Sequence, residues 1–460
     1  MRNAFRAFLL PLFLAAAVRA ADKPNIIFVL VDDLGWTDLG CFGSAFYETP
    51  NIDRLASQGM RFTDAYSACT VCSPTRASVM TGQYPARLHI TDWIEGHKRP
   101  FAKLKIPDWT MQLSTGIPNV ARSLKAAGYA TACIGKWHLG NEECYPDKQG
   151  FDVNLGGYNR GQPPSYFAPY KIPTLPEGPD GEFLTDREAA EAATFITANK
   201  DRPFFLYLPH YAVHTPIQAK KEVIEKYKAK QDKDAPQRNV GYAALVESVD
   251  DAMGVLLRTL DDLNLADKTV IVFTSDNGGL LGCTSNAPLR AGKGSAYEGG
   301  VRVPLIVRWP GAVKPGSVSH TPVISADYFP TLLAMAGAPL PDAHTVDGRS
   351  LVPVLTGSGA LDRDAIYWHY PHYHPGGATP YGAVRAGDFR LVEFYEDNRA
   401  ELYNLKDDLG ETRDLAAAQP EKAAALRKKL ADWRQSVGAQ MPTPNPDYDP
   451  EKAAQPKKNR

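Results

Sequence analysis

The chain has 460 residues, of which 44% are hydrophobic and 22% charged, the balance of an ordinary globular protein. A chain of this length can bury a large core, and its length predicts roughly two or three domains. The formal net charge of −1 argues against nucleic-acid binding, so an anionic ligand would need a local cationic pocket.

The N-terminal residues 1–20 have the pattern of a secretory signal peptide. Arg2 and Arg6 precede the apolar run 8–18, and small residues suit cleavage after Ala20. The apolar run is too short to span a bilayer, and no later stretch is long and apolar enough. The sequence therefore predicts an exported protein, secreted or periplasmic, without a membrane span.

The cysteines of an exported chain could pair in disulfides. The chain has six, at Cys41, Cys69, Cys72, Cys133, Cys144 and Cys283. Their spacing assigns no bridge, although Cys133 and Cys144 would close the shortest plausible loop. No cysteine–histidine spacing suits a zinc site.

Apolar runs and helical patterns alternate along most of the chain. Residues 24–31 form a continuous apolar run, typical of a central strand covered on both faces. Helices are expected over 50–56, 119–127 and 242–260, and further strands over 129–134, 204–208 and 269–273. This alternation predicts an α/β fold in which helices pack on both faces of a sheet.

The character of the chain changes after residue 357. Short strand patterns at turn-like spacing predict a small antiparallel sheet, over 365–368, 381–385, 389–392 and 401–404. A helix is expected over 420–433, and the proline- and charge-rich end is expected to be disordered. These changes divide the chain into the leader 1–20, a main domain 21–357, a small α+β subdomain 358–441 and a tail 442–460.

Two of the predicted central strands end in oxygen-bearing side chains. Asp32 and Asp33 follow the run 24–31, and Asp276 and Asn277 follow a later strand. If the two strands are neighbours, these side chains converge outside their carboxyl ends, and an all-oxygen site suits calcium or magnesium. Alternatively, such pairs are turn and cap residues, which is their commoner use.

A cysteine lies at a predicted helix start in Cys72-Ser73-Pro74-Thr75-Arg76. Pro74 suits the first turn of a helix, whose N-terminus attracts negative charge. Arg76 could bind an oxyanion through its forked guanidinium. The alternative is a buried cysteine beside an ordinary helix start.

Three further segments carry cationic or titratable side chains. In Gly-Lys-Trp-His-Leu-Gly, Lys136 and His138 are two residues apart, so that in extended backbone both face one side. Lys293 lies between glycines, which suits a backbone that comes close to a ligand. His214 follows the strand that ends near Pro209. Each of these residues could instead be structural, as a surface lysine or a packed histidine.

Taken together and in this order, the motifs between residues 25 and 304 resemble those of the type I, formylglycine-dependent sulfatases. The nearest resemblance is to arylsulfatase A and to N-acetylgalactosamine-sulfatase-like polysaccharide sulfatases. It implies the alkaline-phosphatase-like fold, a large mixed sheet sandwiched by helices with a smaller C-terminal antiparallel sheet plus helix. It also implies a sulfuric ester hydrolase whose catalytic domain is 21–357.

The resemblance implies two cofactors. A formylglycine-generating maturation enzyme would oxidise Cys72 to formylglycine, whose hydrate attacks the sulfur of a sulfate ester. A calcium ion would be held by Asp32, Asp33, Asp276, Asn277 and the modified Cys72. The cation would hold the sulfate and stabilise the negative charge that builds up.

The resemblance also gives roles to the cationic residues. Arg76 would steady the hydrated aldehyde, and His138 would hold it. Lys136, and with it Lys293, would bind sulfate oxygens. His214 would donate a proton to the leaving alcohol, a role that suits the pKa range of histidine.

The substrate is expected to be a sulfated oligo- or polysaccharide. The loop 89–99 resembles that of sulfatases acting on galactose or N-acetylgalactosamine units, and the polar-aromatic loop 370–377 could reach the rim of the pocket. The residues expected to bind sugar are Asp92, Trp93, His97, Arg99, His372 and His374. We expect exo-removal of the 4-sulfate in preference to the 6-sulfate.

One expected residue has no clear counterpart. Some sulfatases place a polar side chain near the sulfate, and between Gly150 and Tyr166 the candidates are Asn159 and Ser165.

Two other functions also fit the motifs. One is a phosphodiester or phosphonate monoester hydrolase that uses the same formylglycine, and the other is an unmodified, non-catalytic protein that binds sulfated glycans.

Overall fold

The computed structural model describes residues 23–96 and 98–453. Its centre is an eight-stranded sheet in the order β10-β2-β9-β8-β1-β7-β5-β6. The strands are β1 (Asn25–Val31), β2 (Met60–Phe62), β5 (Ala130–Ile134), β6 (Val153–Leu155), β7 (Phe204–Pro209), β8 (Thr269–Ser275), β9 (Leu305–Arg308) and β10 (Ser317–Ser319). Most neighbours are parallel, but β9 runs antiparallel to both β8 and β2, so the sheet is mixed as expected. The signal peptide predicted over 1–20 lies outside the described residues.

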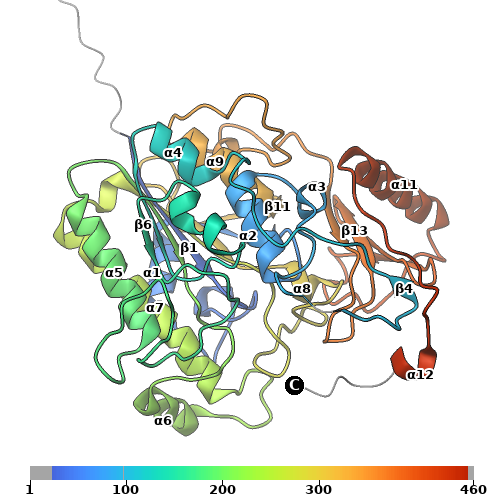
Figure 1. Cartoon of the computed structure of the whole chain (residues 1–460), viewed down its shortest axis with the longest axis horizontal. Coiled ribbons are helices and arrows are strands. Elements are labelled where there is room, and N and C mark those ends of the chain that lie inside the picture. The colour runs from blue at the N-terminus through green and yellow to red at the C-terminus, as the bar shows by residue number, and fades with distance from the viewer. Residues whose placement is uncertain (1–22, 97, 454–460) are drawn as a thin grey trace, which may run out of the picture.

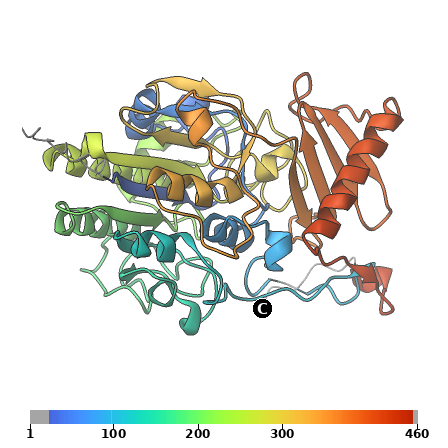
Figure 2. The same ribbon diagram turned by 90° about the horizontal axis from the view of Figure 1, so that it is seen from above.

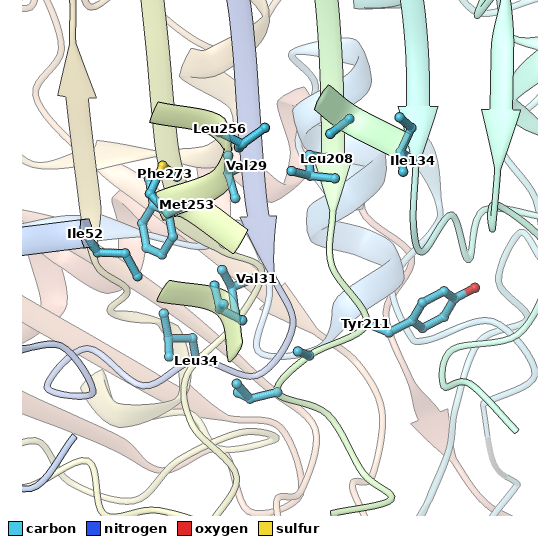
Figure 3. Close-up of a cluster of buried hydrophobic side chains, with 14 of the residues drawn as sticks. Val29, Val31, Leu34, Ile52, Ile134, Leu208, Tyr211, Met253, Leu256 and Phe273 are labelled. Carbon is cyan, nitrogen blue, oxygen red and sulfur yellow. The ribbon is translucent and has the colours of Figure 1, made fainter. Parts of the chain in front are cut away.

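Helices cover both faces of this sheet (Figures 1 and 2). One face packs against α1 (Pro50–Gln58), α5 (Leu184–Ala198) and α7 (Val240–Asp262), and the other against α2 (Cys72–Thr81), α4 (Val120–Ala126) and α9 (Tyr328–Met335). Side chains of β1 alternate between the two cores, with Val29 in the first, drawn in Figure 3, and Phe28 in the second. This double burial explains the unbroken apolar run of the strand.

The strands that carry the acidic pairs are direct neighbours. β1 and β8 pair in parallel along their whole length, with Val31 opposite Ser275. Asp32 and Asp276, the next residue of each strand, therefore leave the sheet side by side at its carboxyl edge. The condition on which the predicted metal site depended is confirmed.

The C-terminal sheet has four antiparallel strands in sequence order. They are β12 (Ile366–Tyr370), β13 (Tyr381–Ala386), β14 (Phe389–Phe394) and β15 (Ala400–Asn404), and α11 (Pro420–Ser436) packs on them (Figure 2). A third core joins this sheet to the main domain, and the indole of Trp368 donates a hydrogen bond to the Ser67 carbonyl at 2.9 Å. The predicted small sheet and helix are confirmed.

Residues 442–453 differ from the disordered tail predicted over 442–460, and residues 454–460 lie outside the described residues. Thr443–Pro444 form β16, which pairs antiparallel with β4 (Leu104–Lys105), and α12 (Pro450–Ala453) follows. The Asn445 amide donates to the carbonyls of Pro100 and Ala102 at 2.8 and 2.7 Å. A proline-rich composition favours disorder for a segment alone, but here the extended backbone has an edge to pair with.

The remaining short elements are α3 (Pro85–Leu88), α6 (Lys221–Lys230), α8 (Glu298–Val301), α10 (Val352–Leu355), β3 (Ala65–Tyr66) and β11 (Val323–Ile324). All six cysteines are free thiols, so the suggested Cys133–Cys144 bridge does not form. Cys133 points into the core beneath the sheet, and Cys144 belongs to a separate 3₁₀ turn.

No helix in the described part of the chain is both long enough and apolar enough to cross a membrane.

Candidate active site

Cys72 is the first residue of α2, the helix near the centre of Figure 1. Its position is fixed by the next residue, because the Ser73 hydroxyl donates to the His138 carbonyl at 2.9 Å and accepts from the Ile94 amide at 3.0 Å. Pro74 lies in the first turn, as predicted. These contacts bring the cysteine to the loops that surround a pocket.

The pocket has a volume of about 590 Å³. Its floor is formed by Cys72, His138, His214 and Lys293. Its rim includes Trp93, Glu95, Arg160, Gln162 and His374. We use floor and rim for these two sets below. The volume is within the range of sites that take small organic ligands.

Carboxylates lie directly behind the floor. Arg76 is fully buried, and its Nε and a terminal nitrogen lie 2.9 and 2.8 Å from one oxygen of Asp276. Its other terminal nitrogen donates to the Lys136 carbonyl at 3.1 Å. The guanidinium therefore connects the end of β8 to the segment that carries Lys136.

Two lysines pair with the acidic residues that follow β1. The Lys136 ammonium lies 2.5 Å from Asp32, and the Lys293 ammonium lies 2.7 Å from Asp33. Burial opposes the charge of Asp33, but Lys293, His214 and the Asn277 hydrogen bond together outweigh burial and lower the pKa of that carboxyl below its usual range. The positive and negative groups of this site therefore nearly balance.

Lys136 and His138 do not lie on an extended strand. The segment after β5 is irregular, with φ of 112° at Gly135 and 58° at His138. The Lys136 amide donates to the Pro209 carbonyl at 2.6 Å, and the His138 amide donates to the Tyr158 carbonyl at 3.0 Å. Tertiary hydrogen bonds, rather than strand alternation, bring both residues to the site.

The residues behind the floor fit a hard divalent cation. Ligand atoms of Asp32, Cys72 and Asp276 lie within 4.8 Å of one another. Asp32 and Asn277 each have a buried side-chain oxygen without a hydrogen-bond donor among the described residues, the arrangement that oxygen ligation of a cation would satisfy. Burial and the neighbouring Asp276 raise the pKa of Asp32 to about 8, and a bound cation would oppose that shift.

His214, in the floor, has one ring nitrogen in a hydrogen bond with the backbone. Its Nδ1 donates to the Thr215 carbonyl at 2.8 Å, which leaves Nε2 facing Asp33 at 3.7 Å. The hydroxyl of Tyr166 donates to the carbonyls of Tyr211 and His214 at 2.6 and 2.9 Å, and so holds this loop. Burial and Lys293 lower the pKa of His214 to about 3, and an anionic ligand beside Lys293 would oppose that shift.

His138 is neutral and offers an acceptor. Burial and the nearby Lys136 hold its pKa well below the usual value of histidine. Its Nε2 donates to the Ile94 carbonyl at 3.2 Å, whereas Nδ1 has no hydrogen-bond partner among the described residues. Nδ1 is therefore able to accept a proton or a hydrogen bond from a hydroxyl group in the pocket.

Trp93 and His374 are the residues of the predicted sugar-binding set that line the pocket. Their rings meet edge to face, with centroids 5.5 Å apart. Asp92 is buried instead and accepts from the Tyr370 hydroxyl at 2.8 Å, because it points away from the pocket while Trp93 points toward it. Burial also raises the pKa of Asp92 well above its usual value.

Two other predicted sugar-binding residues do not line the pocket. His372 is buried beneath the rim, 2.8 Å from the Thr91 hydroxyl and in ring contact with Trp109. Arg99 is half-buried, apart from the lining residues. His97 lies outside the described residues.

The rim also contains residues that the sequence did not indicate. Arg160 and Gln162 line the pocket, whereas Asn159 and Ser165, the two candidates from that segment, do not. Gly161, between Arg160 and Gln162, could have indicated this segment. A Cβ at position 161 would lie 2.5 Å from Cε1 of His138, so only glycine fits there. A glycine between two polar residues is suited to such a close approach.

Comparisons with known proteins show the family of the chain. The family model described as Sulfatase matches residues 24–338, and the one described as N-sulphoglucosamine sulphohydrolase, C-terminal, matches residues 292–436. A Formosa agariphila protein named Sulfatase is 36% identical over 90% of this chain and 89% of its own length. Human N-acetylgalactosamine-6-sulfatase is 35% identical over 76% of this chain and 69% of its own length. The structure of Ps i-CgsB in complex with k-i-k-neocarrahexaose has a TM-score of 0.78 at 31% identity, covering 93% of this chain and 95% of that one.

The chain therefore belongs to the sulfatase family. It has the alkaline-phosphatase-like fold of that family and is a sulfuric ester hydrolase. The predicted family, fold and class of reaction are confirmed.

Proposed function

We propose that the protein is a calcium- and formylglycine-dependent exo-sulfatase that removes O-sulfate from galactose or N-acetylgalactosamine units of a polysaccharide. The observation that carries the proposal is the position of Cys72 at the pocket floor, with Asp32 and Asp276 behind it. Around it lie Lys293, which can bind sulfate, and two histidines that can move protons.

The chemistry divides between the cofactors and the side chains. When present, calcium supplies positive charge and formylglycine supplies a geminal diol in place of the thiol. Nδ1 of His138 would accept a hydrogen bond from a hydroxyl of that diol. Lys293 would bind a sulfate oxygen at the floor. Lys136, which does not line the pocket and pairs with Asp32, would bind one from behind the floor, and Arg76 keeps Asp276 and the Lys136 segment in place. Nε2 of His214 carries the proton that the leaving alcohol takes.

The sulfate position is proposed from the resemblance of the loop 89–99 alone. We propose the 4-sulfate as the preferred substrate. The second candidate is the 6-sulfate, because five relatives, the human one among them, are named N-acetylgalactosamine-6-sulfatase. Trp93 supports a sugar substrate, since an aromatic ring at the rim can stack on the apolar face of a pyranose.

Maturation and export are part of the same proposal. Cys72 is only 3% exposed in the folded chain, so a formylglycine-generating enzyme would have to reach it before folding is complete. A leader over residues 1–20 would deliver the enzyme to the periplasm or the exterior, where it would meet polysaccharide.

Parallel kinetics test the function. We expect the matured protein to release sulfate from galactose 4-sulfate, with slower release from the 6-sulfate, and to hydrolyse an aryl phosphate diester far more slowly. Faster turnover of the phosphate diester would instead support the phosphodiesterase alternative. Binding of a sulfated glycan without sulfate release would support the non-catalytic one.

A further inference from the structure

An exposed ion pair spans the mouth of the pocket. A terminal nitrogen of Arg160 lies 3.1 and 3.3 Å from the two carboxylate oxygens of Glu95. Their side chains are 58% and 64% exposed, and both residues line the pocket. Such a pair contributes little to stability, so a ligand anion can replace Glu95 as the partner of Arg160 at little cost.

Both members of this pair are anchored next to His138. Glu95 follows Ile94, whose carbonyl accepts from Nε2 of His138 at 3.2 Å. Arg160 precedes Gly161, which packs against the ring of that same histidine, and Tyr158 accepts from its amide. Consecutive Cα atoms are about 3.8 Å apart, so the backbone of each residue lies close to His138, and both side chains line the pocket that contains it.

Arg160 differs from the other cations of the site. Lys293, the other lining residue with a lysine or arginine side chain, pairs with the buried Asp33, and Lys136 pairs with the buried Asp32. Among the described residues, the guanidinium of Arg160 has a single carboxylate partner, the exposed Glu95, and its planar fork matches the oxygens of a sulfate or a carboxylate.

We propose that Arg160 is a specificity residue that binds a second anionic group of the glycan, a sulfate or a carboxylate, beside the sulfate to be removed. Glu95 competes with the ligand for Arg160. In the free enzyme its carboxylate pairs with the guanidinium, and it repels anionic ligands that reach the rim without contacting Arg160. The inference rests on the proposed sulfatase function and names the substrate class of the same pocket, a glycan with at least two negative charges close together.

The test compares oligosaccharides of one backbone. The first carries the scissile sulfate alone, the second carries an added sulfate on the same or the next sugar, and the third carries a carboxylate there. Arg160→Ala should lower the ratio of kcat/KM for doubly over singly anionic substrate by about 10- to 100-fold. The added group that loses more in this variant identifies which anion Arg160 binds.

Two more variants sharpen the result. Glu95→Gln should raise the ratio by about twofold to fivefold, a gain that disappears when Arg160→Ala is added. Arg258→Ala, on an exposed arginine of α7 outside the pocket, should leave the ratio unchanged. A ratio that stays at the wild-type value in Arg160→Ala, or that falls equally in Arg258→Ala, would overturn the proposal.

Calorimetry separates this proposal from the sulfatase function. The glycans are titrated into the Cys72→Ala protein with and without Arg160→Ala. Weaker binding of the doubly anionic glycan in the double variant supports the role of Arg160 even if no preparation releases sulfate, an outcome that would count against the proposed function alone. Equal binding by both proteins overturns the role of Arg160.

Discussion

The charged groups behind the pocket floor are buried and paired inside the protein, whereas those of the rim are exposed and loosely paired. Arg76 and Asp276 have no exposed side-chain surface, but Arg160 and Glu95 are 58% and 64% exposed. Removing one partner of a buried pair costs about 3–5 kcal/mol, and an exposed pair is worth about 0–1 kcal/mol. Substitutions behind the floor are therefore costly in stability, whereas residues of the rim can be substituted to suit a different substrate at little cost.

The largest effect is expected at the residue that supplies the nucleophile. Cys72→Ala should lower kcat for sulfate ester hydrolysis by at least about 10⁴-fold, because the remaining groups only bind and polarise the substrate. Ion chromatography of released sulfate measures the loss. Cys41→Ala, at a half-buried thiol outside the pocket, is the matched control and should keep the wild-type rate. A Cys72→Ala protein with near wild-type turnover would show that the floor is not the reaction centre.

Metal removal should be nearly as damaging. A chelator should abolish activity and lower the melting temperature, since calcium at 100 times its Kd contributes about 2.7 kcal/mol to folding. Asp32→Asn should remove the rise in melting temperature on adding calcium, while Asp147→Asn on the surface should not. If the native protein melts at the same temperature with chelator and with calcium, the acidic cluster is not a metal site.

His214 should show its role through the leaving group. His214→Ala should slow hydrolysis of a sugar sulfate by about 10²- to 10⁴-fold, because a poor leaving alcohol needs a proton. The loss on nitrophenyl sulfate should be much smaller, since nitrophenolate leaves unprotonated. Equal losses on both substrates would argue against proton donation by this histidine.

Tyr166 holds the His214 loop without touching the pocket, so its effect should be smaller. Tyr166→Phe removes the hydroxyl that bonds the Tyr211 and His214 carbonyls and should lower kcat on a sugar sulfate by about 10-fold. The loss should shrink on nitrophenyl sulfate, in parallel with His214→Ala. A loss that is independent of the leaving group would mean that the tyrosine is structural only.

The smallest effect is expected from the C-terminal segment that supports the loop below the rim. Truncation after Met441 deletes β16 and the Asn445 contacts to Pro100 and Ala102. KM should rise about twofold to fivefold, as expected when about 1 kcal/mol of ordering is lost, with kcat unchanged. Hydrogen exchange over residues 98–105 should quicken. An unchanged KM together with quicker exchange would show that this loop does not shape the rim.

The sequence predicted the fold well and the rim poorly, for one physical reason. A strand buried on both faces must be apolar throughout, so β1 can be recognised from its own residues. The acidic residues after β1 and β8 can likewise be found from their position at the strand ends. Asp92 was expected at the rim because of its loop, but its partner Tyr370 lies 278 residues along the chain. Arg160 was missed because its place depends on the packing of Gly161 against His138, a tertiary contact.

The measurement that tests the account most directly is the mass of the Cys72 peptide, from protein matured in its own host and assayed for sulfate release. The account predicts the mass loss of thiol-to-aldehyde conversion, with sulfate release in proportion to the converted fraction. A cysteine that remains unmodified in an active preparation would contradict the central claim that this residue supplies the nucleophile.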